Sequence, residues 1–269
     1  MNNPAQRVAR SSRNNRVLRF LARVGFAVNG LLHALIGIIA ISLAVGAGSG
    51  GDADQSGAMS TLARTPGGVL ILWVVFVGLV ALGIWLIVSA FVQVPSERKK
   101  RALHYASEIG KGLAYLAVAA TTLTFARGGG TDSAKSTTDL SAQLLSSPGG
   151  VFVVVLIGAL VAGIGVYFVV KGATKRFTRD LTLPAGRAAK WTVALGVFGY
   201  VAKGVVLVVV GILFWVAAAT VDPSKGSGLD GGLRALAALP FGVFILVVVG
   251  VGLIAYGLYS CVRARYARL

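Results

Sequence analysis

Six long apolar runs alternate with polar segments along this chain. They lie near residues 24–46, 68–92, 107–126, 150–170, 191–220 and 241–262. As helices rising about 1.5 Å per residue, all six runs are long enough to cross a hydrocarbon layer of about 30 Å. We therefore predict an all-α integral membrane fold with six transmembrane helices.

A repeated frame joins these runs in pairs. In every copy, a polar residue followed by glycine precedes a proline by 37 positions: Asn29-Gly30 to Pro66, Lys111-Gly112 to Pro148, and Lys203-Gly204 to Pro240. Each copy also has a leucine four residues before the proline and glycines two and seventeen residues after it. An aromatic residue follows nineteen after the proline, at Trp85, Tyr167 and Tyr259. Because a fixed internal period defines the architecture, we predict three tandem two-helix repeats.

The loop inside each repeat carries a leucine-bearing stretch and ends at the repeated proline. We expect a short interfacial helix there, followed by a helix that starts at the proline, since proline suits a first helical turn. Thr65 and Ser147 directly precede two of the prolines. Their side chains are of the type that caps helix N-termini, and we predict that role for them.

The predicted organisation has five segments: a basic arm over 1–23, repeats over 24–94, 105–173 and 190–263, and a basic tail over 264–269. A cleaved signal peptide is an alternative interpretation of the first apolar run, because arginines precede it. That run is longer than a typical signal core, however, and it fills the first position of a repeat that occurs twice more.

The distribution of basic residues predicts the orientation. Of 26 Lys and Arg residues, 19 lie in the N-terminal arm, in 93–107, in 171–190 and in 263–269, and five lie in the alternate loops. Basic loops are retained in the cytoplasm. We therefore expect both termini to be cytoplasmic. With two spans per repeat, all three repeats then point the same way, as parallel helix hairpins with pseudo-threefold symmetry.

Composition supports a membrane protein and excludes several other classes. The chain is 56% hydrophobic and 13% charged, with net charge +17. No nucleic-acid recognition fold accompanies the basic residues. The single cysteine rules out an intramolecular disulfide and a multi-cysteine metal site, and no phosphate-binding loop or nucleophile elbow is present. We expect no enzyme, no cofactor, no metal and no nucleic-acid partner. Anionic lipid headgroups are the expected partners of arginines in the arm, at Arg7, Arg10, Arg13 and Arg16.

A few polar residues lie within the apolar runs, in the third nearest the basic side. They are Asn29, His33, Glu108, Lys111 and Lys203. Ionisable residues are costly in a bilayer and are site hypotheses by default. One interpretation is that lysines near the interface extend to the headgroups. The other is that the equivalent positions converge on the bundle axis and form an inward-facing pocket for an anionic headgroup or small metabolite.

The repeat resembles a bacterial membrane family known as "domain of unknown function 1206". The clearest copy is Gly199-Tyr200-Val201-Ala202-Lys203-Gly204 with the segment from Leu236 to Gly242. Asn29 departs from the basic residue typical of the family, and Ser107-Glu108 stands where Gly-Tyr is expected. The resemblance implies a multi-pass protein of the bacterial cytoplasmic (inner) membrane with three two-helix repeats, and it implies no activity.

Two functions remain open from the sequence. The first is a non-catalytic accessory or scaffold protein that packs against a membrane-protein partner, or binds lipid, through its glycine-rich helix faces. The alternative is a small transporter or channel whose polar pocket lies on the cytoplasmic side of the bundle. Transporter helices are often interrupted near the midplane, and no run here is visibly interrupted.

Overall fold

A computed structural model describes residues 16–46, 52–92, 98–182 and 186–267. The long helices are α2 (Arg16–Ala44), α4 (Gly68–Val92), α5 (Arg98–Ala126), α7 (Gly150–Ala173), α8 (Arg187–Thr220) and α10 (Gly242–Tyr266). The short ones are α3 (Gln55–Ala63), α6 (Ser133–Leu145), α9 (Gly228–Ala237) and the 3-10 turns η1 (Arg176–Asp180) and η2 (Pro223–Lys225). The six long helices are long and apolar enough to cross a membrane. The predicted all-α fold with six spans is confirmed.

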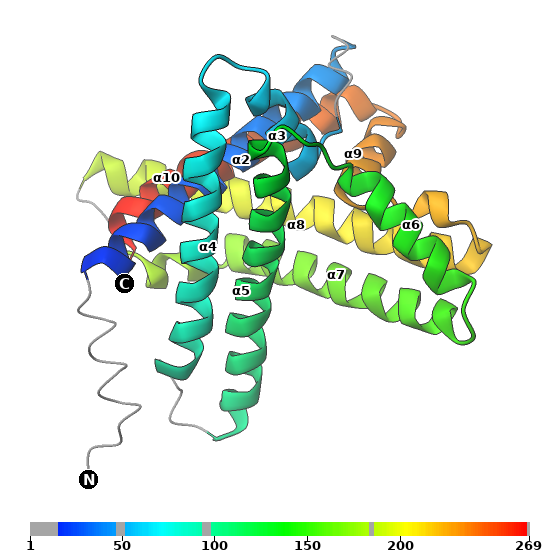
Figure 1. Cartoon of the computed structure of the whole chain (residues 1–269), viewed down its shortest axis with the longest axis horizontal. Coiled ribbons are helices and arrows are strands. Elements are labelled where there is room, and N and C mark those ends of the chain that lie inside the picture. The colour runs from blue at the N-terminus through cyan, green and yellow to red at the C-terminus, as the bar shows by residue number, and fades with distance from the viewer. Residues whose placement is uncertain (1–15, 47–51, 93–97, 183–185, 268–269) are drawn as a thin grey trace.

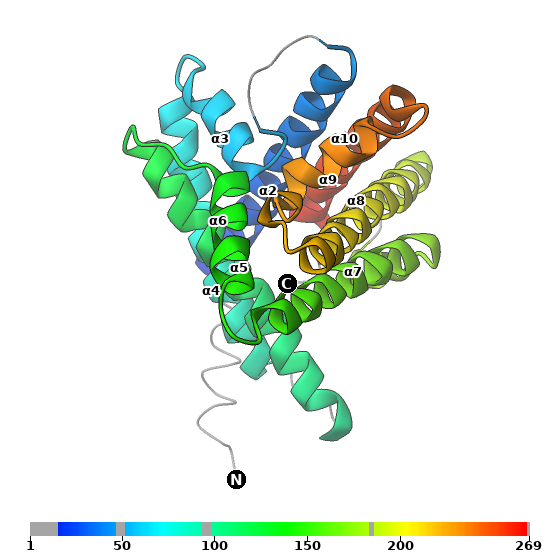
Figure 2. The same ribbon diagram turned by 90° about the vertical axis from the view of Figure 1, so that its right-hand side faces the viewer.

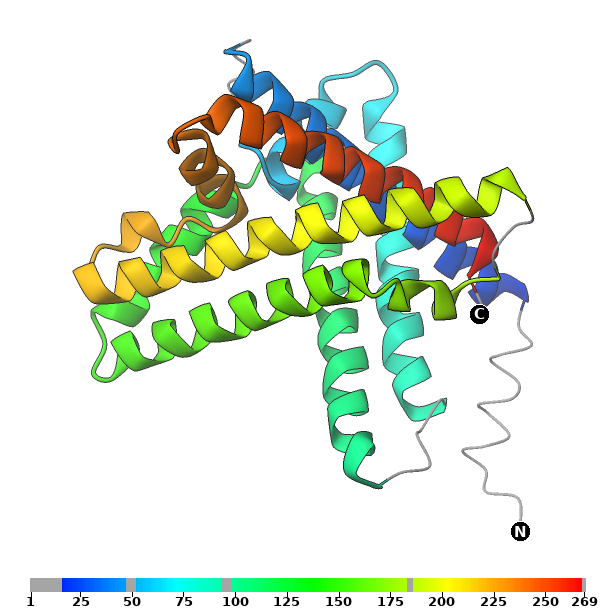
Figure 3. The same ribbon diagram turned by 180° about the vertical axis from the view of Figure 1, so that it is seen from behind.

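The closest helix pairs join different repeats. α4 packs along α5, α7 along α8, and α10 along α2. Figures 1 and 3 show the α4/α5 and α7/α8 pairs side by side, and Figure 2 shows α10 next to α2. Each pair therefore combines the second helix of one repeat with the first helix of the next. The third repeat returns to the first and completes the ring.

The glycine columns of the sequence explain this pairing. A Cβ on Gly204 would lie 2.6 Å from the Gly165 carbonyl oxygen, and a Cβ on Gly165 would lie 2.7 Å from that of Gly204. The corresponding glycines meet in the other two pairs, Gly83 with Gly112 and Gly257 with Gly30. Small residues let helix backbones approach closely in lipid, where packing rather than hydrophobic burial drives association.

Packing within the repeats is unequal. α2 contacts α4 in the first repeat, and α8 contacts α10 in the third. In the second repeat, α5 and α7 barely touch along their described lengths. The ring of helix pairs is therefore less tightly closed at this place than at the other two.

Short helices cover one end of the bundle, which we call the outer side. Figure 2 shows α3, α6 and α9 in front of the long pairs. The Ala53 N–H donates to Asp230 Oδ1 (2.8 Å), which links repeats 1 and 3. The Ser133 N–H donates to Ser56 Oγ (3.1 Å), which links repeats 1 and 2. Ser141 Oγ donates to the Gly226 carbonyl (3.4 Å) and links repeats 2 and 3.

The repeated proline lies in a turn, and the following long helix begins two residues after it, at Gly68, Gly150 or Gly242. The intervening residue has positive φ, at Gly67 (75°), Gly149 (75°) and Phe241 (61°). A Cβ on Gly68 or Gly150 would collide with the carbonyl of the leucine four residues before the proline. The Leu-x-x-x-Pro-x-Gly motif is therefore a compact turn between a short and a long helix.

Two details of the predicted loop are wrong. The long helices do not start at the proline, because the left-handed residue must first reverse the chain direction. Thr65 and Ser147 do not cap them. Their hydroxyls donate instead to the Leu62 and Leu144 carbonyls, both at 2.7 Å, at the end of the preceding short helix. A serine or threonine side chain can bond either to the free N–H groups at a helix start or to the free carbonyls at a helix end. Residue type alone therefore gave the wrong role for Thr65 and Ser147.

At the inner side, the connection between α7 and α8 folds back on the bundle. Phe177 of η1 is fully buried and stacks on Tyr200, with ring centroids 5.3 Å apart. Leu181 forms an isolated antiparallel bridge with Ala267, and the Thr182 N–H donates to the Tyr266 carbonyl (2.9 Å). This connection therefore fastens the inner end of α10.

We predict that Gly165→Ala destabilises the protein, because its Cβ would press on the Gly204 carbonyl. Overpacking of this kind costs about 1–3 kcal/mol. Gly163, on the same helix, faces open space, since no heavy atom lies within 4 Å of its Cβ position. Gly163→Ala should therefore leave stability unchanged or raise it. Thermal unfolding of both variants in detergent checks the prediction, and equal melting temperatures would contradict it.

A second prediction concerns Asp54, whose side chain caps α3 by accepting from the Gly57 N–H. Burial raises the pKa of Asp54, while hydrogen bonds from Ser56 and Gly57 oppose the rise. With a folded pKa above the unfolded value of about 4, its contribution to stability is present at low pH and is lost as pH rises through the folded pKa. Asp54→Asn keeps a capping side chain and should gain stability relative to wild type between about pH 4 and pH 7.

Asp222→Asn is the matched control for this pH dependence. Hydrogen bonds from Ser224 lower the pKa of Asp222. Its contribution is therefore present at neutral pH and lost on acidification, so Asp222→Asn should change stability in the opposite sense. Because this loss occurs as pH falls below about 4, thermal unfolding measured from about pH 2 to pH 7 separates the two variants, and parallel curves for both would refute the prediction.

Candidate functional site

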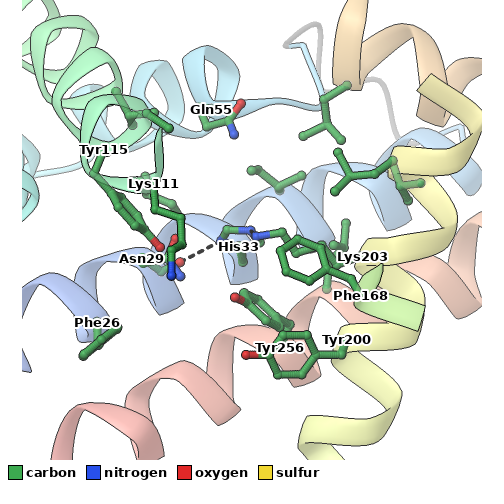
Figure 4. Close-up of a pocket in the computed structure, with 18 of the residues that line it drawn as sticks. Phe26, Asn29, His33, Gln55, Lys111, Tyr115, Phe168, Tyr200, Lys203 and Tyr256 are labelled. Atoms are coloured by element: carbon green, nitrogen blue, oxygen red, sulfur yellow. Dashed lines mark hydrogen bonds between the residues drawn. The ribbon is translucent and has the colours of Figure 1, made fainter. Parts of the chain in front are cut away.

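A cavity of about 380 Å³ lies between the three helix pairs. All six long helices contribute to its wall, which reaches Gln55 of α3 and Leu229 of α9 toward the outer side. Four of the five polar residues singled out from the sequence line it: Asn29, His33, Lys111 and Lys203. Figure 4 shows Lys111 and Asn29 on one side of His33 and Lys203 on the other.

His33 connects the first repeat to the third. Its Nδ1 lies 2.8 Å from the Asn29 backbone oxygen, and its Nε2 lies 2.9 Å from Lys203 Nζ. A carbonyl only accepts, so Nδ1 carries the proton and Nε2 accepts from the lysine ammonium. The contact therefore joins a neutral imidazole to a charged lysine.

Aromatic rings surround the Lys203 ammonium. Its Nζ lies 4.5 Å from the centroid of the Tyr256 ring and 5.3 Å from that of Phe168. A cation is attracted to the face of an aromatic ring, more strongly where water is excluded. Rings and an imidazole thus hold the charge of Lys203 without neutralising it.

Lys111 and Glu108 are at the edge of this arrangement. They form an ion pair one helical turn apart on α5, with the Lys111 side chain 49% exposed and that of Glu108 19% exposed. Lys111 lines the cavity, and Glu108 is not part of the wall. Four of the five predicted residues therefore come together, and the fifth pairs with one of them from outside.

Two further basic residues, Lys171 and Arg263, line the cavity. In the sequence analysis both of them were counted with the charges of the loops and the tail. Lys171 pairs with Asp180 of η1, at 3.1 Å between Nζ and Oδ2. The Arg263 guanidinium carbon lies 4.4 Å from the centroid of the Phe26 ring, and its buried Nε has no hydrogen-bond partner within the described residues. Both follow the repeated tyrosine by four residues, a shared column that could have revealed them.

The cavity is therefore rich in positive charge. Lys111, Lys171, Lys203 and Arg263 line it, and none of the described residues in its wall is an aspartate or glutamate. Glu108 and Asp180 offset two of these cations from outside the wall. Neither Lys203 nor Arg263 pairs with a carboxylate in the ranges that the structure describes. An anion is the ligand that this charge distribution favours.

Two other sequence predictions concern the arginines of the N-terminal arm and the presence of a metal site. Arg7, Arg10 and Arg13 lie outside the described residues, as does the side chain of Arg16, where α2 begins inside the predicted arm. The lipid contacts expected there stay predictions. Among the described side chains, no group of three His, Cys, Asp or Glu residues could hold a metal ion.

These features define a multi-pass membrane protein built from three helical repeats around a basic cavity. The chain belongs to the family described as Domain of Unknown Function (DUF1206), whose model matches residues 24–93, 106–175 and 198–267. The offsets between the matched segments equal those between Asn29, Lys111 and Lys203. The predicted family and its three tandem repeats are confirmed.

One curated relative is "Uncharacterized protein YxxB" of Bacillus subtilis (strain 168), 30% identical over 166 residues. The match covers 61% of this chain and 59% of the relative, so the chain spans less than two thirds of the relative's length. No solved structure matches the chain.

Proposed function

We propose that this protein is a non-catalytic membrane protein that binds an anionic, phosphate-type group in its basic cavity. The observation that carries the proposal is the pair of cations, Lys203 and Arg263, that line the cavity without a carboxylate partner within the described ranges. Unpaired charge inside a bilayer is costly and marks ligand sites. A bound anion would offset that cost.

The proposed orientation places the inner side of the bundle in the cytoplasm of a bacterium. The connection between α7 and α8 contains Lys175, Arg176 and Arg179, and α8 begins at Arg187. Basic segments next to transmembrane helices are retained on the cytoplasmic side. The cavity cations then lie in the cytoplasmic third of the membrane, at a depth where an anionic headgroup or a cytoplasmic anion can reach them.

A small transporter for the same anion is the second candidate. The observation that favours it is the extent of the cavity, which runs from Gln55 and Leu229 near the outer side to Arg263 near the inner side. Uptake of labelled phosphate into proteoliposomes separates the two candidates, because a binding protein would retain the anion without accumulating it inside.

We predict that Lys203→Met weakens binding of inorganic phosphate to the purified protein by about tenfold to a hundredfold. A hydrogen bond to a charged group contributes about 1.5–3 kcal/mol, and about 1.4 kcal/mol corresponds to a tenfold change in affinity. Titration calorimetry in detergent measures the change directly.

Lys190→Met is the matched control, since Lys190 lies on the same helix but is exposed and outside the cavity wall. It should bind phosphate as the wild type does. If the wild type binds no phosphate and retains no anionic lipid, or if both variants bind like the wild type, the proposed function is wrong.

A further inference from the structure

The weak contact between α5 and α7 leaves one side of the helix ring open. The first and second helices pack together in repeats 1 and 3 but barely meet in repeat 2. α5 and α7 are also the least buried of the six spans. The backbone of both helices is described along its whole length, so the difference belongs to the arrangement of the helices.

The exposed residues of the cavity wall identify the mouth of the cavity. Ser107, Lys111 and Ala114 of α5 and Tyr167 of α7 are exposed and line the cavity. The wall residues from α2, α4, α8 and α10 are buried or half-buried. The cavity therefore opens sideways, between the two helices that do not pack together.

The depth of this mouth matches one leaflet of the membrane. The span of α5 runs from His104 at its inner end to Ala126 at its outer end. The mouth residues Ser107 to Ala114 lie in the inner half of that span, about 18–29 Å of helix below Ala126. Ser107, at the inner end of the mouth, lies close to the depth at which the phosphates of the inner leaflet meet the acyl chains, and Ala114 lies further into the hydrocarbon layer.

We propose that the ligand is the headgroup of an anionic phospholipid of the inner leaflet, which enters the cavity sideways between α5 and α7. This inference rests on the proposed function and names its ligand. Charge complementarity supports it, since the mouth leads to Lys203, which has no carboxylate partner within the described residues, whereas Lys111 at the mouth is already paired with Glu108.

The apolar surface beside the mouth suits the rest of such a lipid. Leu113 of α5 is 57% exposed, and Leu160 and Ile164 of α7 are 64% and 42% exposed. These side chains face the bilayer and continue outward from the mouth. The acyl chains of the lipid stay in the membrane and lie along these apolar side chains, while its phosphate reaches the cations of the cavity. The charged headgroup therefore does not have to cross the hydrocarbon layer.

The experiment blocks the mouth without removing a cation. Ala114→Trp places a large side chain in the opening, and Leu113→Trp places the same side chain on the neighbouring lipid-facing position, outside the cavity wall. Full-length protein is reconstituted in phosphatidylcholine nanodiscs with phosphatidylglycerol. Native mass spectrometry after gentle detergent extraction then measures how much phosphatidylglycerol remains bound. Calorimetry with inorganic phosphate on delipidated protein measures the anion site by itself, and thermal unfolding checks that both variants are folded.

We expect Ala114→Trp to lose most of the bound phosphatidylglycerol, whereas Leu113→Trp, outside the cavity wall, retains it and binds inorganic phosphate like the wild type. Equal retention by both variants would overturn the sideways route and leave the anion site standing. Phosphate binding by a wild type that retains no phosphatidylglycerol would overturn the lipid as ligand and keep the proposed function. Absence of both kinds of binding in the wild type would overturn the two proposals together.

Discussion

Close backbone contact between glycines is the interaction on which this structure depends. Helices in lipid gain little from hiding apolar side chains, because the surrounding acyl chains are equally apolar. Glycine pairs such as Gly165 with Gly204 and Gly257 with Gly30 bring carbonyls of one helix against the other helix. These pairs join different repeats, the third with the first included, so the ring forms through interfaces between repeats. The outer hydrogen bonds from Ala53, Ser133 and Ser141 then link the repeats at one end.

The same arrangement determines where the cations lie. Lys111 and Lys203 directly precede glycines of the contact, and both line the cavity next to that close interface. Burying a charge costs free energy unless it finds partners. Here the partners are a carboxylate for Lys111 and Lys171, an imidazole and rings for Lys203, and a ring for Arg263. Only the carboxylates neutralise charge, so the interior remains positive.

Much of the fold could be predicted from the sequence, because apolar run length and a fixed repeat period are properties of the chain itself. The convergence of Asn29, His33, Lys111 and Lys203 was a hypothesis from repeat equivalence. The sequence could not indicate that the repeated glycines would join helices of different repeats. A glycine at a fixed repeat position looks the same in the sequence whether it contacts a helix of its own repeat or of another one. It also could not place Lys171 and Arg263, because a cation at a helix end follows the same pattern in a cavity as at the interface. The depth of the Lys171 and Arg263 side chains in the bundle, and the direction in which they point, depend on how the helices cross.

The departures from exact repetition give the cavity its chemistry. A basic residue at all three equivalent positions would place like charges around one small cavity, where their repulsion is poorly screened. The first repeat instead has Asn29, and one turn later His33 stands where the other copies have Tyr115 and Leu207. The neutral imidazole can accept a hydrogen bond, so Lys203 reaches across to it. The repeat thus provides a common backbone frame, and the substitutions within it replace a ring of repelling cations with one asymmetric site.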